Sequence, residues 1–212
     1  QWGNHDILWM GPRFLQMWKK WFSTEQVESM EKSLPSPYSN LYIDRDNFLY
    51  TSSAGAGAGK ALKHLNMLGV NILQPAEKKF GHGVFGDLEV SYDNGEEVAS
   101  AFVDVCVTES GLLCGADATR GRLFLYDADC NLVAIWGGSG QRRGTFKALA
   151  AVERQGDSFL ALDSEKPSLT VFEPTAYMRR VLDALTFYSA GKYIESVERW
   201  QEILRENSHL SI

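Results

Sequence analysis

The sequence has no apolar run of the roughly 18 residues that a membrane-spanning helix needs, so it predicts no such span. It also lacks an excess of basic residues: lysine and arginine number 21, against 27 aspartate and glutamate residues, for a net charge of −6. Nucleic-acid binding needs a basic face, so we expect no nucleic-acid partner. The chain starts at Gln1 and shows no signal peptide, which leaves its compartment open.

Cysteine and histidine are sparse and scattered. The three cysteines form no CxxC pair and no zinc-type spacing with histidine, and an odd number does not predict a disulfide framework. Cys106 and Cys114 flank an expected hairpin turn, and we expect buried thiols on strands. No spacing typical of a catalytic triad is found among the histidines, which are His5, His64, His82 and His209. The pattern therefore predicts no cofactor and no catalytic residues.

A regular strand pattern is present instead. Between Phe102 and Phe146, four short apolar runs are separated by Gly, Asn, Asp or Ser. The runs are FVDVCVTES, GLLCGADAT, GRLFLYDAD and CNLVAIWGG. Short strands joined by tight turns are typical of a four-stranded antiparallel meander, which is the unit of a β-propeller blade.

Two further stretches are copies of this unit. Residues 107–113 align with 43–49, residues 116–117 with 162–163, and residues 122–126 with 168–172. A spacing of about 45 residues is usual for propeller repeats. The aspartates at 117 and 163 occupy equivalent positions, which indicates a structural turn or cap rather than a unique catalytic acid. The third copy lacks a fourth strand, because the pattern turns helical after residue 172.

Helical patterns flank the strands. Residues 1–34 predict a strand followed by two helices, the first with an aromatic, basic composition. From Ala176 the period is helical again, and two amphipathic helices joined at Gly191 predict an αα-hairpin. We therefore divide the chain into a segment over 1–34, blades over 35–175 and a helical hairpin over 176–212.

The blades resemble NHL-type β-propeller repeats. Residues 120–127 (RGRLFLYD), followed by Asn131-Leu132, resemble that family's arginine-led strand and turn. The glycines at 137–140 and the GTF at 144–146 resemble its glycine-rich entry into the next blade. The resemblance covers roughly residues 39–174.

The C-terminal hairpin resembles one tetratricopeptide repeat, with small and aromatic residues at that repeat's positions; Ser196 departs from its usual alanine and Ser208 from its usual proline. The order of blades and hairpin resembles cell-envelope proteins of Gram-positive bacteria whose activity is undefined. An extracytoplasmic or cell-surface location is what this resemblance implies.

We expect a mainly β fold with flanking helices: a partial, about three-blade β-propeller of four-stranded antiparallel meanders, an N-terminal helical segment and a C-terminal αα-hairpin. NHL-type propellers usually close with about six blades. We therefore expect the chain to be a fragment of a larger protein, with its ring closed by further blades or by a second chain.

The expected function is non-enzymatic: a binding or scaffold module for a protein or carbohydrate-type ligand, using propeller loops and helical surfaces. A basic spot offers candidate contacts for an acidic group, and so does a histidine in a Gly-His-Gly loop. These ligand-binding candidates are Arg120, Arg122, Arg142, Arg143 and His82.

The alternative is a metal-dependent hydrolase of the lactonase type, with its site in the central channel of the propeller. Such a site would bind Ca²⁺ through carboxylate and amide oxygens near the ends of inner strands. The candidate ligands are Asp44, Asp104 and Asn40, and the matching position in the third copy, near Ala150, offers no ligand.

Overall fold

A computed structural model describes residues 38–53, 61–73, 85–87, 91–93 and 96–206. The segment over 1–34 and His82 therefore lie outside the described residues. The strands are β1 (Asn40–Ile43), β2 (Leu49–Ser52), β3 (Leu62–Leu65), β4 (Ser91–Asp93), β5 (Glu96–Val98), β6 (Phe102–Val107), β7 (Leu113–Asp117), β8 (Arg122–Tyr126), β9 (Leu132–Gly137), β10 (Leu149–Gln155), β11 (Ser158–Asp163) and β12 (Ser168–Phe172). Two helices follow, α2 (Ala176–Ser189) and α3 (Tyr193–Glu206).

The stretch over residues 102–137 forms the expected meander. Its sheet has the order β6-β7-β8-β9, and every pair is antiparallel. The turns need left-handed backbone at Gly111, with φ of 81°, and at Cys130, with φ of 62°. Glycine adopts this conformation without the steric cost that a side chain brings. The four-stranded unit is thus confirmed.

The sheets on either side each have three strands in the described chain, β1-β2-β3 and β10-β11-β12. Among the described residues that follow β3, a single bridge joins Leu65 to Asn71. The side chain of Asn71 accepts hydrogen bonds from the backbone N–H groups of His64 and Leu73, at 3.0 and 3.2 Å. The N–H of His64, on the outer side of β3, is thus bonded to a side chain rather than to the backbone of a further strand.

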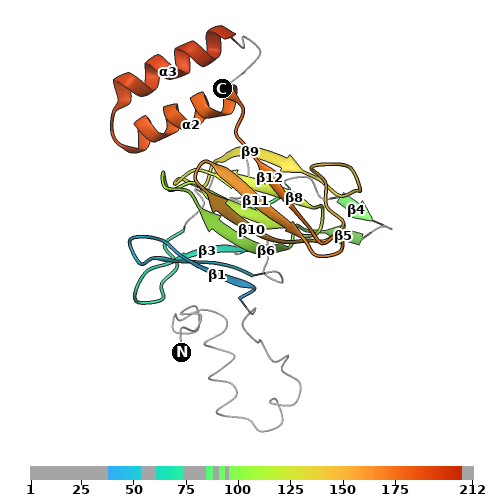
Figure 1. The fold of residues 1–212 in the computed structure, drawn as a ribbon. Helices are drawn as coiled ribbons and strands as arrows, with labels where there is room; N and C mark the ends of the chain where they lie inside the picture. Colours follow the sequence, from blue (N-terminus) through green and yellow to red (C-terminus); the bar gives the residue numbers. More distant parts are fainter. Residues whose placement is uncertain (1–37, 54–60, 74–84, 88–90, 94–95, 207–212) are drawn as a thin grey trace, which may run out of the picture.

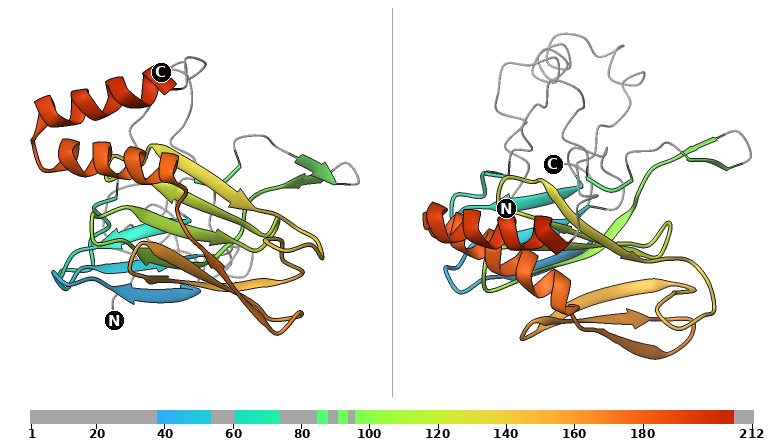
Figure 2. Two further views of the ribbon diagram at one scale, coloured as in Figure 1. Left: turned by 45° about the horizontal axis from the view of Figure 1, so that its top comes forward. Right: turned by 90° about the horizontal axis from the view of Figure 1, so that it is seen from above.

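The three sheets lie side by side, with β6 of the middle sheet in contact with β1 of the first and β10 of the third (Figures 1 and 2). Hydrogen bonds between described residues connect these inner strands. The Tyr42 hydroxyl donates to the Val107 carbonyl at 3.2 Å, and the Val152 N–H donates to Asp104 Oδ2 at 2.7 Å. Antiparallel meanders arranged in sequence order around their first strands make a partial propeller.

Apolar side chains fill the spaces between the sheets. Successive side chains of β8 point to opposite faces of the middle sheet, so this strand contributes to the apolar clusters on both faces. Phe124 and Tyr126 belong to the cluster shared with the first sheet. Leu123 and Leu125 belong to the cluster shared with the third, which also contains Phe146. A strand covered on both faces reads as a continuous apolar run, as this one does.

The repeated aspartates occupy equivalent turns, as expected. Asp117 is fully buried and accepts the N–H groups of Ala101 and Thr119, at 2.8 and 3.0 Å. Asp163 is equally buried and accepts four backbone N–H groups, from residues 147, 148, 165 and 166. Each carboxylate lies at the end of its blade's second strand. It binds N–H groups of the residues just before the first strand and of the turn after the second strand. The structural role of these aspartates is thus confirmed.

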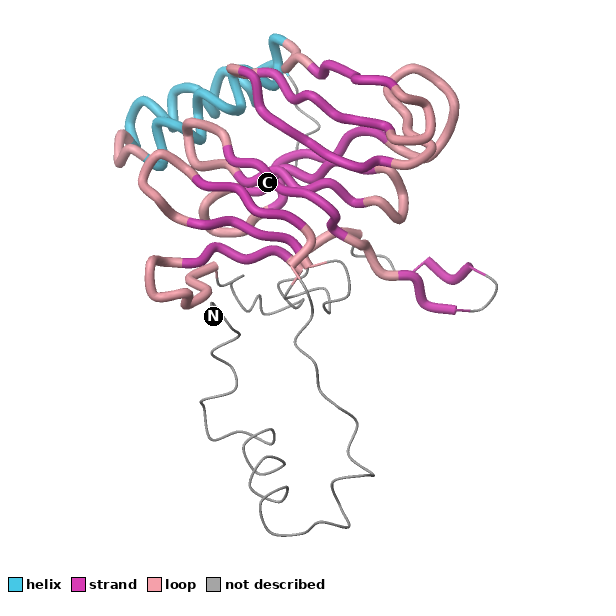
Figure 3. Tube along the Cα trace, turned by 60° about the horizontal axis from the view of Figure 1, so that its bottom comes forward, coloured by secondary structure: helices cyan, strands magenta, loops and turns pink. Residues whose placement is uncertain are grey.

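The helices α2 and α3 form the expected αα-hairpin, which lies at one end of the molecule (Figures 1 and 3). The Thr175 hydroxyl caps α2 by accepting the N–H of Met178 at 3.2 Å. Ser196 is buried between the helices, and its hydroxyl donates to the Ala184 carbonyl at 2.9 Å. On the other side of α2, Leu182 and Leu185 pack against the core shared by the middle and third sheets.

The pair β4–β5 projects from the join between the first and middle sheets (Figure 3). Neither described helix is both long and apolar enough to cross a membrane.

Candidate functional site

Two of the four arginine candidates are engaged by one carboxylate. Asp87 Oδ2 lies 3.1 Å from Arg120 Nη1, and Asp87 Oδ1 lies 2.6 Å from Arg122 Nη1. Asp87 comes from the stretch between the first and middle sheets, and its side chain is largely buried. The pair of arginines therefore neutralises a buried carboxylate and ties that stretch to the middle sheet.

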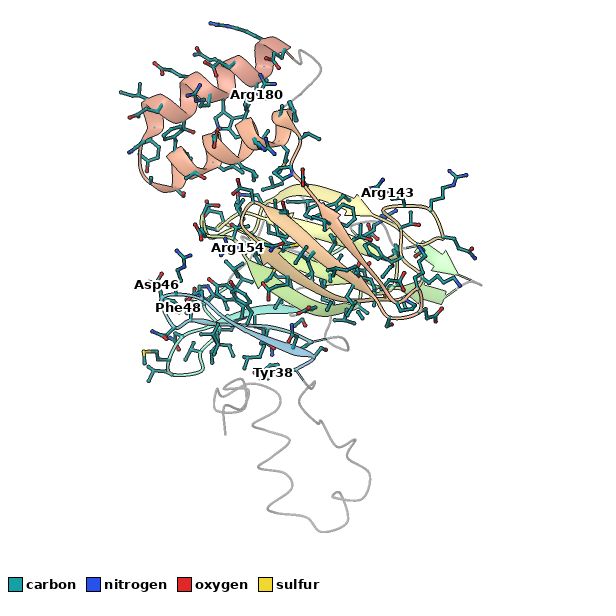
Figure 4. All side chains as sticks on the ribbon, viewed as in Figure 1. Tyr38, Asp46, Phe48, Arg143, Arg154 and Arg180 are labelled. Carbon is teal, nitrogen blue, oxygen red and sulfur yellow. The ribbon has the colours of Figure 1, made fainter. Side chains whose placement is uncertain are left out.

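Arg142 and Arg143 lie instead in the loop over residues 138–146, which joins β9 to β10. Arg143 extends outward from this loop (Figure 4). The base of this loop is closed by two backbone bonds, from Gly140 N–H to the Phe146 carbonyl at 2.9 Å and from Phe146 N–H to the Gly138 carbonyl at 2.8 Å. Phe146 is buried and anchors the loop to the core. The arginines are thus carried on a fixed base.

Both guanidinium groups are exposed, and neither has an ion-pair partner within the part of the chain that the structure describes. A third positive charge lies close to the same loop. Lys166 Nζ donates to the Thr145 carbonyl at 2.7 Å and lies 3.9 Å from Asp163 Oδ2. These contacts fix the lysine ammonium against the loop and the adjacent sheet.

A groove of about 410 Å³ runs between this loop and strand β12. Its walls are formed on one side by residues 141–145 and Lys166, and on the other by residues 168–171 of β12. One wall is therefore basic, and the other is the outermost described strand of the third sheet. The arrangement suits an acidic ligand, because a guanidinium fork matches the geometry of a carboxylate.

The candidate metal ligands have structural partners. Asp104 is buried, and its oxygens accept the N–H groups of Val105 and Val152, both at 2.7 Å. Burial raises the pKa of the Asp104 carboxyl, while these two backbone donors oppose the rise. In the turn after β1, Asp44 Oδ1 accepts the N–H groups of Asp46 and Phe48, each at 2.9 Å.

Asn40 begins β1 and Asp44 follows its end, so their Cα atoms are separated by roughly 13 Å of extended chain. Asn40 Oδ1 accepts the N–H of Leu41 at 2.6 Å. Among the described residues, no group of three or more His, Cys, Asp or Glu side chains is placed to hold a metal ion.

Lys166 was not among the candidates from the sequence. The lack of a fourth strand in the third copy signalled the open edge of β12, but its residues were not proposed as a site. The alignment of residues 168–172 with β8 places a strand there that has no successor like β9. Asp87 gave no signal, because a lone aspartate between strands does not show which arginines it will meet.

No protein-family model matches the chain, and no curated protein matches its sequence. Two solved structures are similar over part of it. One is the virginiamycin B lyase of Staphylococcus aureus, at 11% identity and a TM-score of 0.36, covering 69% of this chain and 44% of the lyase. The other is the computationally designed Ika4 protein, at 13% identity and a TM-score of 0.33, covering 68% of this chain and 95% of that protein.

The chain thus spans less than half the length of the lyase. The likeness to both structures is distant, and the strand pairing described above defines the fold.

Proposed function

We propose that the chain is a non-enzymatic binding module that takes an acidic ligand in the groove between the 138–146 loop and β12. The observation that carries this proposal is the pair of exposed guanidinium groups, Arg142 and Arg143, on a loop whose base is fixed. Because the loop base is already ordered, its backbone loses less conformational entropy when a ligand binds.

The charge balance of the chain favours a local site over general attraction of anions. The net charge is −6, so the chain as a whole does not attract acidic molecules, and an acidic ligand needs a local cluster of cations. Arg142, Arg143 and Lys166 gather on one groove wall. Exposed ion pairs contribute about 0.2–1 kcal/mol each, so we expect weak, salt-sensitive binding unless the groove adds other contacts.

A fluorescence anisotropy titration with labelled hexaglutamate tests this proposal, with labelled hexaglutamine as the neutral control. The double variant Arg142→Gln/Arg143→Gln should bind hexaglutamate about tenfold more weakly, which corresponds to a loss of about 1.4 kcal/mol. The matched control is Lys192→Gln/Arg205→Gln, which removes the same charge from the helical hairpin. Equal affinities for all three proteins would contradict the proposed site.

The wider setting that we propose is an NHL-like propeller protein of a bacterial cell envelope, with tetratricopeptide-like helices as a second interaction surface. Exposed apolar side chains at one end of the hairpin support that surface; they are Tyr188, Tyr193, Ile194 and Val197. Fractionation of the native host, with detection by antibody, would test the location.

A further inference from the structure

The third sheet has one described strand fewer than the middle sheet, at its outer edge. In the middle sheet, Leu123 and Leu125 of β8 pair with Trp136 and Ala134 of β9. The equivalent residues of β12 are Leu169 and Val171, and the described chain contains no strand beyond them (Figure 2). The middle sheet therefore shows what a completed third sheet would look like.

The backbone groups of Leu169 and Val171 point toward this open edge. The hairpin between β10 and β11 has a two-residue turn, so its closing pair, Gln155 and Ser158, exchanges both hydrogen bonds. Bonding alternates along an antiparallel strand, so Ala161 of β11 bonds to Thr170 of β12. The N–H and C=O groups of the residues on either side of Thr170 consequently face away from β11.

The open edge and the basic groove coincide. Residues 168–171 form one groove wall, and they include both residues whose backbone groups face outward. Their side chains are also accessible, with 60% of Leu169 and 53% of Val171 exposed. An unpaired strand edge with apolar side chains beside it is a template for the addition of another strand.

We propose that an extended segment of a partner protein adds to β12 as the fourth strand of the third sheet, antiparallel to it and with an acidic C-terminal end. The direction follows from the middle sheet, where the C-terminal residue of β9, Gly137, pairs with Arg122. The counterpart of Arg122 is Ser168, at the end of β12 that follows Lys166. Acidic residues at the end of the added strand therefore meet Lys166, Arg142 and Arg143.

This inference rests on the proposed function and adds the form of the ligand. The strand supplies main-chain hydrogen bonds to Leu169 and Val171, and apolar residues opposite them contact the exposed side chains. The basic loop supplies the charge contacts. An acidic ligand that is not extended would make only the charge contacts with the basic loop.

The probe is a synthetic peptide, acetyl-SVATWEE, whose alanine and tryptophan take the places that Ala134 and Trp136 hold in β9. N-methylation of that alanine and tryptophan blocks the amides that would bond to β12. N-methylation of the valine and threonine leaves those amides free and serves as the matched control. We expect the first modification to weaken binding at least tenfold, and the control peptide to retain most of its affinity, in anisotropy titrations of the full chain.

Amide hydrogen exchange, followed by NMR, locates the peptide. In the free chain, Leu169 and Val171 should exchange rapidly, while Leu123 and Leu125 remain protected as internal references. The unmodified peptide should slow exchange at Leu169 and Val171 at least tenfold.

Four results would overturn the inference. Protection of Leu169 and Val171 in the free monomer would show that a segment of this chain already covers the edge. Protection that appears only with dimer formation would assign the edge to a second copy. Equal binding of both methylated peptides would show that charge alone holds the ligand, which contradicts strand addition but not the proposed function. Failure of every acidic peptide to bind would contradict both strand addition and the proposed function.

Discussion

Replacement of Asp104 by alanine tests how the middle and third sheets are joined. The carboxylate lies on β6 and accepts one N–H from its own strand, at Val105, and one from β10, at Val152. Both donors lie at the inner edge of their sheets, and both residues are almost fully buried. Removing the carboxylate leaves two buried backbone donors without this acceptor.

The size of the effect follows from these two bonds. An orphaned buried donor costs about 1–3 kcal/mol, so two of them cost about 2–6 kcal/mol. The variant no longer bears the free-energy cost of burying a carboxylate, the same desolvation that raises the pKa of Asp104. This gain offsets part of the loss. We therefore expect Asp104→Ala to lower the free energy of unfolding by about 2–4 kcal/mol. Asp104→Asn keeps one acceptor oxygen, so its free energy of unfolding should lie between those of the unmodified protein and Asp104→Ala.

Urea unfolding followed by tryptophan fluorescence measures the effect. With an m-value of about 2 kcal/mol/M, the midpoint of Asp104→Ala should fall by about 1–2 M. Asp129→Ala, which removes an exposed carboxylate from the β8–β9 turn, is the control and should stay close to the unmodified protein. A midpoint for Asp104→Ala within about 0.2 M of the unmodified protein would refute the reasoning. A rise in the midpoint with Ca²⁺, lost in Asp104→Ala, would instead support the metal-site alternative.

Two further predictions concern titratable groups. Burial alone would raise the pKa of Asp163, but four backbone N–H donors lower it to about 2. Its ionisation therefore stabilises the fold above about pH 4, and this contribution is lost as the pH falls toward 2. Asp163→Asn should flatten the dependence of the urea midpoint on pH in that range, and an unchanged slope would contradict this role. Burial also raises the pKa of Cys114, which pairs with Cys106 across the hairpin, so a thiol reagent should modify it only as the chain unfolds. Mass spectrometry would identify the modified thiols, and native-state labelling of Cys114 as fast as that of half-buried Cys130 would refute the prediction.

The meander could be predicted because its evidence is local. A short continuous apolar run along β8, with turn residues at its ends, specifies a strand that is buried on both faces. The role of Asp117 and Asp163 could be predicted for a related reason: two equivalent positions with one carboxylate each point to one shared local contact.

The candidate site was less accessible to sequence reasoning because its contacts are tertiary. From the sequence, Arg120 and Arg122 look like free cations. Their partner Asp87 lies 33 and 35 residues earlier in the chain, and only the fold brings it to them. The groove depends on the distance between a loop and a strand, and no local pattern encodes that distance.

The layout of the sheets has a consequence for how such a chain can change over evolutionary time. Each sheet is formed by one continuous stretch of sequence, and β4–β5 lies at a join between two sheets rather than within either. Duplication of one such stretch would add a complete sheet, and insertion at a join would lengthen the chain without shifting the register of any neighbouring strand pair. Gene segments that encode single sheets are therefore natural units of gain and loss in this architecture.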